Sequence, residues 1–491
     1  MSLSLAFDIA RSSLSTNADR ASIASRNIEA ANDPSATRKS AELIRSYGGG
    51  VRLGSIERTV DARLAHSARE SNTQVAQHQA VLSGLNELNQ IVGQPGDGVS
   101  PTEQLSRLQN NLAAFAAAPQ DHAAAQATLA TATNLVGSLN DSTRLVERVR
   151  STADADIGRA VSNLNQLLSD FEAVNDEIVN GTLSNRDVTD QQDRRDSILA
   201  DISNIVGVRT IARENDDLVI MTEGGLTLFE TNPRSIVFQP SGVLTAGVSG
   251  GSVSIDGVEF SQSGSFGGSE SGSLVGLLAL RDEIAPAVQN QLDEIARGLV
   301  TSFAESDQTG GGAPDQPGLF TYAGAAGVPA GGTIVPGLAG IIAVNDNVNP
   351  DAGGNIWLLR NGAISDPLGT TYLYNTTGSV GFSDRLDQLS QALQSNQSFD
   401  VNANLETSTD LMSFADQSIA WISQQRSERD SQLNSASALA TTAQEALSRA
   451  TGVNLDEEML LMLEVERSYQ ATARLMTTID QMFNELFAAV R

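Results

Sequence analysis

One stretch of the chain has the spacing of a serine nucleophile, Gly247-Val248-Ser249-Gly250-Gly251. Such an elbow needs a strand before it and a helix after it, with an acid and a histidine as partners. Here β-type sequence follows the serine, and the three histidines, His66, His78 and His122, fall in predicted helices. We therefore interpret the stretch as a hairpin turn and expect no catalytic residue.

No stretch has the spacing of a metal site. The chain has no cysteine, and its histidines are too far apart to share an ion, so we interpret them as solvated helix positions. The segment 345–351, Asn-Asp-Asn-Val-Asn-Pro-Asp, alternates oxygen donors but lacks the central glycine and final glutamate of a calcium loop. We interpret it as a turn, and we expect no metal and no cofactor.

Charged residues cluster at Asp190, Asp193, Arg194, Arg195 and Asp196, where two acids could act as a catalytic pair. On a helix these charges are close enough to pair with one another, so we expect ion pairs within the helix. The chain also has no glycine-rich loop of the kind that holds phosphate. These observations disfavour an enzyme.

The overall charge is strongly acidic, with a formal net charge of -28. Nucleic acids and anionic membranes attract basic surfaces, so neither is an expected partner. No run of apolar residues is long enough to cross a membrane. The amino-terminal segment lacks the pattern of a cleaved secretory signal, so any export is expected to use another route.

Both ends of the chain have apolar residues at alternating spacings of four and three, the pattern of a coiled-coil seam. A helix with one apolar side must bury that side, so we expect the two ends to pair with each other or with a neighbouring molecule. The amino-terminal seam consists of Leu3, Phe7, Ala10, Leu14, Asn17, Ala21, Ala24 and Ile28. The carboxyl-terminal seam consists of Met462, Val465, Tyr469, Thr472, Met476, Ile479, Phe483, Leu486 and Val490.

Between the ends, helical periodicity surrounds a β-type middle, which predicts an α+β fold that is mainly α. We expect helices at about 4–31, from 61 to a stop at 93–96, and at 101–118, 120–180, 187–204, 273–304, 384–393, 410–450 and 456–490. The longest carries its own seam, which includes Val146, Ile157, Leu164 and Phe171. Residues 207–262 predict an antiparallel β region, and residues 307–380 predict an irregular one with strands at 332–335 and 354–359.

This order predicts a discontinuous architecture of four parts. Residues 1–34 and 456–491 form the terminal coiled-coil helices, and residues 35–205 and 381–455 form a rod-like helical domain. Residues 206–306 form a β domain with its following helix, and residues 307–380 form a second, variable region rich in glycine and proline. Both β parts are inserted in the rod.

The carboxyl-terminal motif Gly452-Val453-Asn454-Leu455-Asp456-Glu457-Glu458 resembles the flagellar hook-associated protein 1 family, the hook–filament junction proteins. The amino-terminal stretch that contains Asn27, Asn32 and Pro34 is similar to the asparagine-rich signature of flagellar axial proteins. Asp193-Arg194-Arg195-Asp196 and Gly272 to Glu283 are similar to internal stretches of the same family.

This resemblance implies a structural subunit of the extracellular bacterial flagellum. It implies export through the flagellar type III apparatus and an export chaperone on the carboxyl-terminal helix. Its implied partners are further copies in a ring, the hook protein and the second junction protein, on which flagellin is then added. The alternatives are another axial subunit (hook protein, second junction protein or flagellin) and an extracellular binding module on a stalk.

Overall fold

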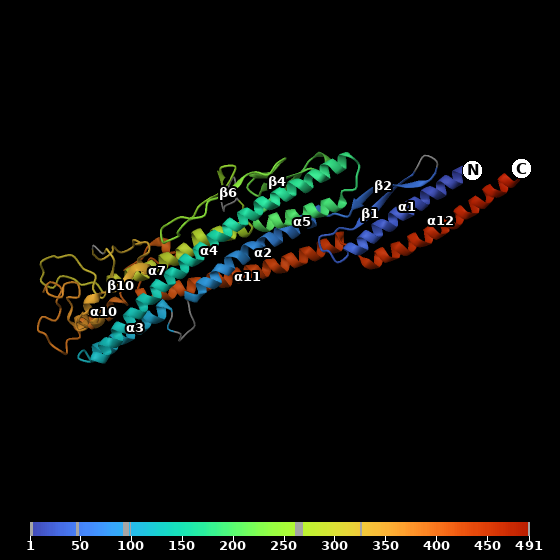
Figure 1. Cartoon of the computed structure of the whole chain (residues 1–491). Coiled ribbons are helices and arrows are strands. Elements are labelled where there is room, and N and C mark those ends of the chain that lie inside the picture. Colours follow the sequence, from blue (N-terminus) through green and yellow to red (C-terminus); the bar gives the residue numbers. More distant parts are fainter. Residues whose placement is uncertain are drawn as a thin grey trace.

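The computed structural model describes residues 3–45, 49–91, 98, 100–260, 269–324 and 327–489. The molecule is long and narrow, and the two chain ends lie together at one tip (Figure 1). A helical arm leads from that tip into a helical rod, and a loop-rich region forms the opposite end. The fold is mainly α with small antiparallel sheets, as predicted.

The arm is built from the two terminal helices, α1 (Leu3–Ala30) and α12 (Leu455–Ala489), which pack against each other and are here called the terminal coil. α1 ends shortly before Pro34, since proline disfavours helix at the residue before it. Strands β1 (Lys39–Arg45) and β2 (Val51–Arg58) form an antiparallel hairpin against α1. The alternation of residues in 51–60 predicts a short extended piece there, which covers β2 but not β1.

The longest element of the rod is α4 (His122–Leu183), whose 62 residues span about 93 Å. Its seam residues are buried along the whole helix, and they contribute to both hydrophobic clusters of the molecule. Asp121 caps the amino end of α4, and its side chain accepts a hydrogen bond from Ala123 N. The other helices of the rod pack around α4 or around its neighbours.

The remaining rod helices agree with their predicted positions. α2 pairs along its length with α11, and α3 packs on α4. A short helix, η1, follows α2, and the predicted stop at 93–96 lies outside the described residues. The bounds are α2 (Ala62–Leu88), η1 (Asn89–Ile91), α3 (Pro101–Ala117), α5 (Thr189–Ile205) and α11 (Leu411–Thr451).

The predicted helix at 273–304 is interrupted by a π-helical turn. It consists of α6 (Ser273–Ala279), the π turn η3 (Leu280–Ile284) and α7 (Ala285–Ser302). Pro286 lies at the start of α7 and has no N–H to donate to the preceding turn, which accounts for the widened turn.

Two three-stranded antiparallel sheets lie along α4, in the orders β3-β4-β5 and β6-β7-β8. The Phe229 ring of β5 packs edge-on against Phe171 of α4, with 5.0 Å between centroids. The strands are β3 (Val208–Ala212), β4 (Leu218–Thr222), β5 (Thr227–Phe229), β6 (Ile236–Phe238), β7 (Val253–Ile255) and β8 (Val258–Glu259), with a short helix η2 (Glu214–Asp216).

Residues 303–403 form a distal region at the end of the rod, and its apolar core is continuous with the core of the rod. The strands predicted at 332–335 and 354–359 are wrong. Gly332 has a left-handed φ of 71°, and residues 354–359 turn into a helix instead. The described elements are β9 (Phe320–Tyr322), α8 (Leu338–Ile341), β10 (Ile342–Val344), η4 (Asp346–Val348), η5 (Pro350–Ala352), α9 (Leu358–Asn361), α10 (Asp384–Ala392), β11 (Gln397–Ser398) and η6 (Val401–Ala403), and β12 (Ser408–Thr409) follows.

Candidate assembly interface

The connector from α1 to β1, residues 31–38, begins beside a buried asparagine. Asn27 Nδ2 donates to Lys39 O at 2.8 Å, and Asn27 Oδ1 accepts from Lys39 N at 3.0 Å. The side-chain amide therefore satisfies two backbone groups that a neighbouring strand would otherwise pair. These two hydrogen bonds fix the start of β1 against α1. They provide a physical reason for asparagine in the amino-terminal motif.

Arg38, at the end of the connector, joins the two ends of the chain. Its backbone N–H donates to Thr451 O at 2.8 Å, and its Nε donates to Glu458 Oε1 at 2.7 Å. Arg38 Nη1 also lies 3.3 Å from Glu457 Oε2. Glu458 is fully buried, and its Oε2 has no hydrogen-bond partner among the described residues. A buried carboxylate depends strongly on its cation, so Arg38 has a structural role.

The break predicted at 452–454 is confirmed, because α11 ends at Thr451 and α12 begins at Leu455. A Cβ on Gly452 would lie 2.5 Å from Ser448 O, which is too close for any other residue without a shift. Asn454 Oδ1 accepts from Asp456 N at 3.0 Å and caps the first turn of α12. The motif therefore ends one helix and starts the next.

The acidic residues of α5 do not pair within their own helix, so that prediction is wrong. Lys39 Nζ bonds Asp190 and lies 3.2 Å from Asp193 Oδ2. Arg58 Nη1 lies 3.1 Å from Asp193 Oδ1 and 2.7 Å from Asp196 Oδ2. Cations of the hairpin reach these acids because the hairpin docks on α5, which local spacing alone cannot reveal. The acidic residues of α5 thus hold the arm to the rod.

The same contact includes two more ion pairs and one arginine that points elsewhere. Arg26 Nη1 lies 2.8 Å from Asp187 Oδ2, and Arg26 Nη2 lies 3.6 Å from Asp190 Oδ1. Burial would raise the pKa of Asp187, but hydrogen bonds from Arg26 and Thr189 hold it below its usual value. Arg195, by contrast, turns into the rod and donates to Asn175 Oδ1 at 2.9 Å.

Seam residues from both ends meet in the terminal coil. Val465 and Ile479 of α12 are only 2% and 5% exposed. The Phe7 and Phe483 rings pack edge-on at 6.4 Å, and Asn17 Nδ2 donates to Ser468 Oγ at 2.9 Å. The other seam residues that are half-buried are Leu3, Leu14, Ala21, Ile28, Met462, Thr472 and Met476.

Two of the predicted interface residues are exposed, and a third is not described. Tyr469 is 45% exposed and Leu486 is 56% exposed, so both remain available on the surface of the coil. Val490 lies outside the described residues. The predicted assembly role of all these side chains stays a prediction.

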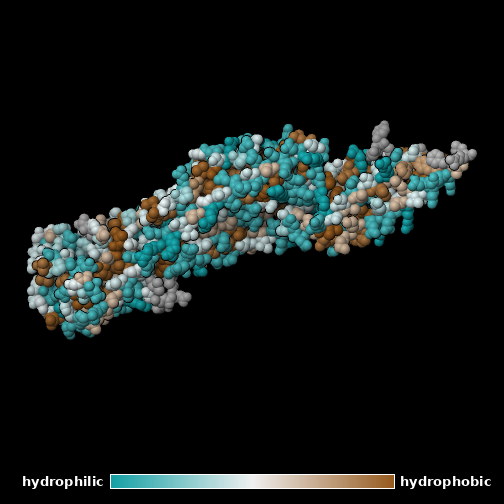
Figure 2. Space-filling view, viewed as in Figure 1, coloured by the Kyte–Doolittle hydropathy of each residue, from teal (hydrophilic) through white to brown (hydrophobic). Residues whose placement is uncertain are grey.

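Apolar side chains of α12 outside the seam also stay exposed, in two groups that the sequence analysis missed. At the start of the helix, Met459, Leu460 and Leu463 are at least half exposed, and Leu475 and Met482 are similarly exposed further along. Figure 2 shows apolar surface where the arm leaves the rod, which is where α12 begins. The spacing of seven from Leu475 to Met482, then four to Leu486, was a readable signal of a second stripe.

Two family models match parts of this chain. The family model described as flagellar hook-associated protein FlgK helical domain matches residues 85–320, and the one described as flagellar basal body rod FlgEFG protein C-terminal matches residues 443–488. Flagellar hook-associated protein 1 of Bacillus subtilis (strain 168) is 21% identical over an alignment of 480 residues, and the match covers 92% of this chain and 88% of that protein. This chain belongs to the FlgK family of flagellar hook-associated proteins.

Other relatives match a smaller part. Flagellar hook-associated protein 1 of Escherichia coli (strain K12) is 21% identical over 54% of this chain and 48% of that protein, and the Salmonella typhimurium protein is 21% identical over 52% and 46%. These matches span about half the length of both relatives. The solved flagellar hook junction protein FlgK from Burkholderia pseudomallei has a TM-score of 0.43 and 19% identity, over 52% of this chain and 47% of that chain.

Membership in the FlgK family identifies the chain as a structural protein of the bacterial flagellum and not an enzyme. Among the described residues, no helix has the length and apolar character needed to span a membrane. In this FlgK-family chain the two sequence motifs meet at one joint, where the connector passes the break between α11 and α12.

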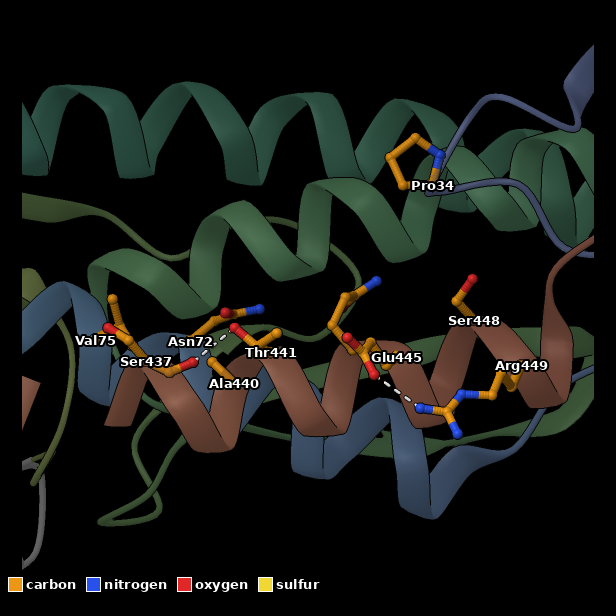
Figure 3. A pocket seen from close by; sticks show the side chains of 10 residues that line it. Pro34, Asn72, Val75, Ser437, Ala440, Thr441, Glu445, Ser448 and Arg449 are labelled. Carbon is orange, nitrogen blue, oxygen red and sulfur yellow. Dashed lines mark hydrogen bonds and ion pairs between the residues drawn. The ribbon is translucent and has the colours of Figure 1, made fainter. Parts of the chain in front are cut away.

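A groove of about 670 Å³ lies next to this joint, between α2 and α11 with Pro34 at one end (Figure 3). Polar side chains of α11 that line the groove form ion pairs and hydrogen bonds within α11 itself. Glu445 Oε2 lies 2.8 Å from Arg449 Nη2, and Thr441 Oγ1 donates to Ser437 O at 2.8 Å. The groove therefore lacks converging polar groups that would define a small-molecule site.

The stretches that suggested other chemistry have structural roles. Gly247 to Gly251 lies in the long connection between antiparallel β6 and β7, where Arg150 Nη2 donates to Val248 O at 2.6 Å. Asn345 and Asn349 use their side-chain oxygens to cap 3-10 turns. A turn at 345–351 is thus confirmed.

Of the histidines, His78 departs from the predicted solvated position. It is half-buried on α2, and burial, together with nearby Arg429, lowers its pKa. His66 is exposed, and His122 is exposed with its ring 5.7 Å from that of Trp357.

Proposed function

We propose that this protein forms the junction ring between the hook and the filament of the flagellum. In this proposal, copies assemble at the hook tip, and the ring templates the second junction protein and then flagellin. Membership in the FlgK family and the names of the relatives support this assignment. The flexible hook and the stiffer filament would then be joined by a subunit that contacts both.

The observation that carries the proposal is the set of apolar side chains that α12 leaves exposed. α12 buries one side against α1 but leaves Met459, Leu463, Leu475, Met482 and Leu486 on its surface. Large apolar patches on a soluble chain mark interaction sites. In a ring, these side chains would pack against terminal coils of neighbouring subunits and of the hook protein.

That placement of α12 also gives the proposed positions of the other parts of the chain. The terminal coil, residues 1–34 with 456–491, would line the inner tube, and the rod-like residues 35–205 with 381–455 would surround it. Residues 206–306 and 307–380 would face outward. Both ends lying at one tip of a long molecule supports this radial order.

Before assembly the same apolar side chains would need protection. We infer a cytoplasmic export chaperone that covers α12, because exposed methionine and leucine side chains favour self-association. The chain would then travel unfolded through the flagellar type III apparatus, without a cleaved signal. A lone amphipathic helix is marginal in water, which suits such a route.

Substitution on α12 tests the proposal. Leu486→Asp should abolish incorporation into flagella, because it places a charge in the apolar contact while the central core stays intact. Met476→Asp should have the same effect through the seam. Asn484→Asp adds the same charge at an exposed polar position of α12 and should be tolerated. Incorporation is measured by immunoblot of sheared flagella from a complemented deletion strain; normal incorporation of Leu486→Asp would contradict the proposal.

A second candidate remains within the same apparatus. The model that matches residues 443–488 is described for rod proteins, so the carboxyl-terminal helix alone suits a hook protein or another axial subunit equally well. The two candidates differ in what a strain without the gene builds. A junction subunit leaves hooks in place, whereas loss of the hook protein removes them.

A further inference from the structure

We propose that Arg38, Lys39 and Arg58 form a two-sided clasp that sets the angle at which the terminal coil leaves the rod. One side of the clasp holds α5 of the rod, and the other side holds the start of α12. These are positioning residues for assembly, since a misaligned coil cannot meet its neighbours. The proposal deepens the proposed function, but it concerns a single chain and is tested without a flagellum.

The rod side of the clasp is centred on Asp193. Its carboxylate accepts from Thr37 Oγ1 at 2.6 Å and lies 3.2 Å from Lys39 Nζ and 3.1 Å from Arg58 Nη1. Asp193 is buried, and so is Lys39, the only lysine of the chain. Separating a buried ion pair is strongly destabilising, because it leaves a charge without a partner and away from water. The hairpin is therefore fixed to α5 at this point.

The coil side of the clasp is the pair of Arg38 with the fully buried Glu458. Arg38 and Lys39 are consecutive, so one short stretch of backbone carries both sides. Asn27 holds the backbone of Lys39 to α1, and Thr451 O accepts from the backbone N–H of Arg38. Four elements, α1, α5, α11 and α12, thus converge on two adjacent residues.

The clasp is needed because the helix itself does not hold the angle. Residues 452–454 between α11 and α12 are not helical, so the axis of α12 is free to change direction there. Contacts on both sides of that break supply the constraint. The family motifs at the two ends of the sequence are the two halves of this joint.

A distance measurement across the joint tests the clasp. The chain has no cysteine, so Thr442→Cys and Gln470→Cys place one spin label on exposed positions of each helix. Pulsed electron spin resonance on the purified full chain should give a narrow distance distribution. Asp193→Asn should broaden that distribution at least about twofold, because Lys39 and Arg58 lose their shared acid. Asp201→Asn, an exposed position further along α5, is the matched control and should leave it narrow.

Arg38→Met provides a second test from the opposite side of the joint. It should also broaden the distribution while the helical content, measured by circular dichroism, stays near that of the unaltered chain. If Asp193→Asn does not fold, Arg38→Met alone tests the clasp. A distribution that stays narrow in both variants would overturn the clasp, as would a broad distribution in the unaltered chain. None of these results depends on where the protein lies in the flagellum.

Discussion

At the scale of single residues, the sequence motifs were visible but their partners were not. Asn27, Gly452 and Glu458 stood out through the resemblance to the family. The structure adds that Glu458 pairs with Arg38, which is 420 positions away in the chain. No local pattern predicts a contact over that separation. Acids in the first turn of α12 also favour the positive end of the helix dipole, but the ion pair of Glu458 is a separate contact.

The acidic residues of α5 illustrate the same limit. Their spacing favours ion pairs within the helix, and Arg194 and Arg195 are close enough in sequence to supply them. Docking of the hairpin brings Lys39 and Arg58 into better positions. The solitary lysine was a signal, but composition alone cannot say that it is buried between two carboxylates.

Asp293 of α7 gives a prediction of pH dependence. Burial raises its pKa to about 6, although Gly337 and Ala339 N–H groups donate to it at 2.8 Å each. A folded-state pKa above the unfolded value stabilises the fold at low pH, and this contribution disappears as the pH rises through about 6. The loss is at most about 3 kcal/mol.

Asp293→Asn removes the titrating group, so the melting temperature should depend less on pH between about 4 and 6 than in the unaltered chain. The variant also loses one acceptor for Gly337 or Ala339 and should melt lower at pH 5. The measurement is a set of thermal melts across that range. Equal slopes in both proteins would show that Asp293 does not titrate there.

At the scale of elements, the helices were predicted well because their signals are local. Proline and glycine mark the ends of α1 and α11, and the seam of α4 at Val146, Ile157 and Phe171 is buried as expected. The prediction of strands in the distal region was wrong because a glycine-rich segment has little periodicity. There, buried side chains hold the loops: Glu305, for example, accepts from Ile364 N and Ser365 N.

The seam of α12 shows a different limit. A straight α-helix drifts about 20° per heptad relative to a strict seven-residue repeat. Over the length of α12 this drift moves Leu486 to the edge of the face that meets α1, where it is exposed. A strict four-three pattern therefore assigns too many residues to one seam. The proposed function rests on the apolar residues of α12 that stay exposed.

Two glycines give a prediction about helix packing. A Cβ on Gly276 of α6 would lie 2.5 Å from Gln77 O of α2, whereas a Cβ on Gly137 of α4 would meet nothing within 4 Å. Gly276→Ala should therefore destabilise the chain by about 1–3 kcal/mol through overpacking. Gly137→Ala should be neutral or stabilise by up to about 1 kcal/mol, since alanine favours helix.

The measurement is denaturant unfolding of both variants beside the unaltered chain. Similar effects of the two substitutions would mean that α2 and α6 do not approach as closely as described. A loss of stability confined to Gly276→Ala would support the close crossing.

At the scale of the whole molecule, the chain is a long body whose ends form one apolar tip. The acidic composition and the absence of catalytic constellations pointed to an assembly protein before any comparison was made. The paired ends were also predicted, because an amphipathic terminal helix needs a partner. The boundaries of the four parts stay a prediction, and the core shared between the rod and the distal region bears on the last of them.

The most direct test of the junction assignment is electron microscopy of a strain that lacks this gene, together with an assay for flagellin in the medium. The account predicts hooks without filaments and monomeric flagellin released outside the cells. Complementation with the unaltered gene should restore filaments. Intact filaments in the deletion strain would contradict the assignment, and loss of the hooks themselves would move the protein to an earlier position in the axial structure.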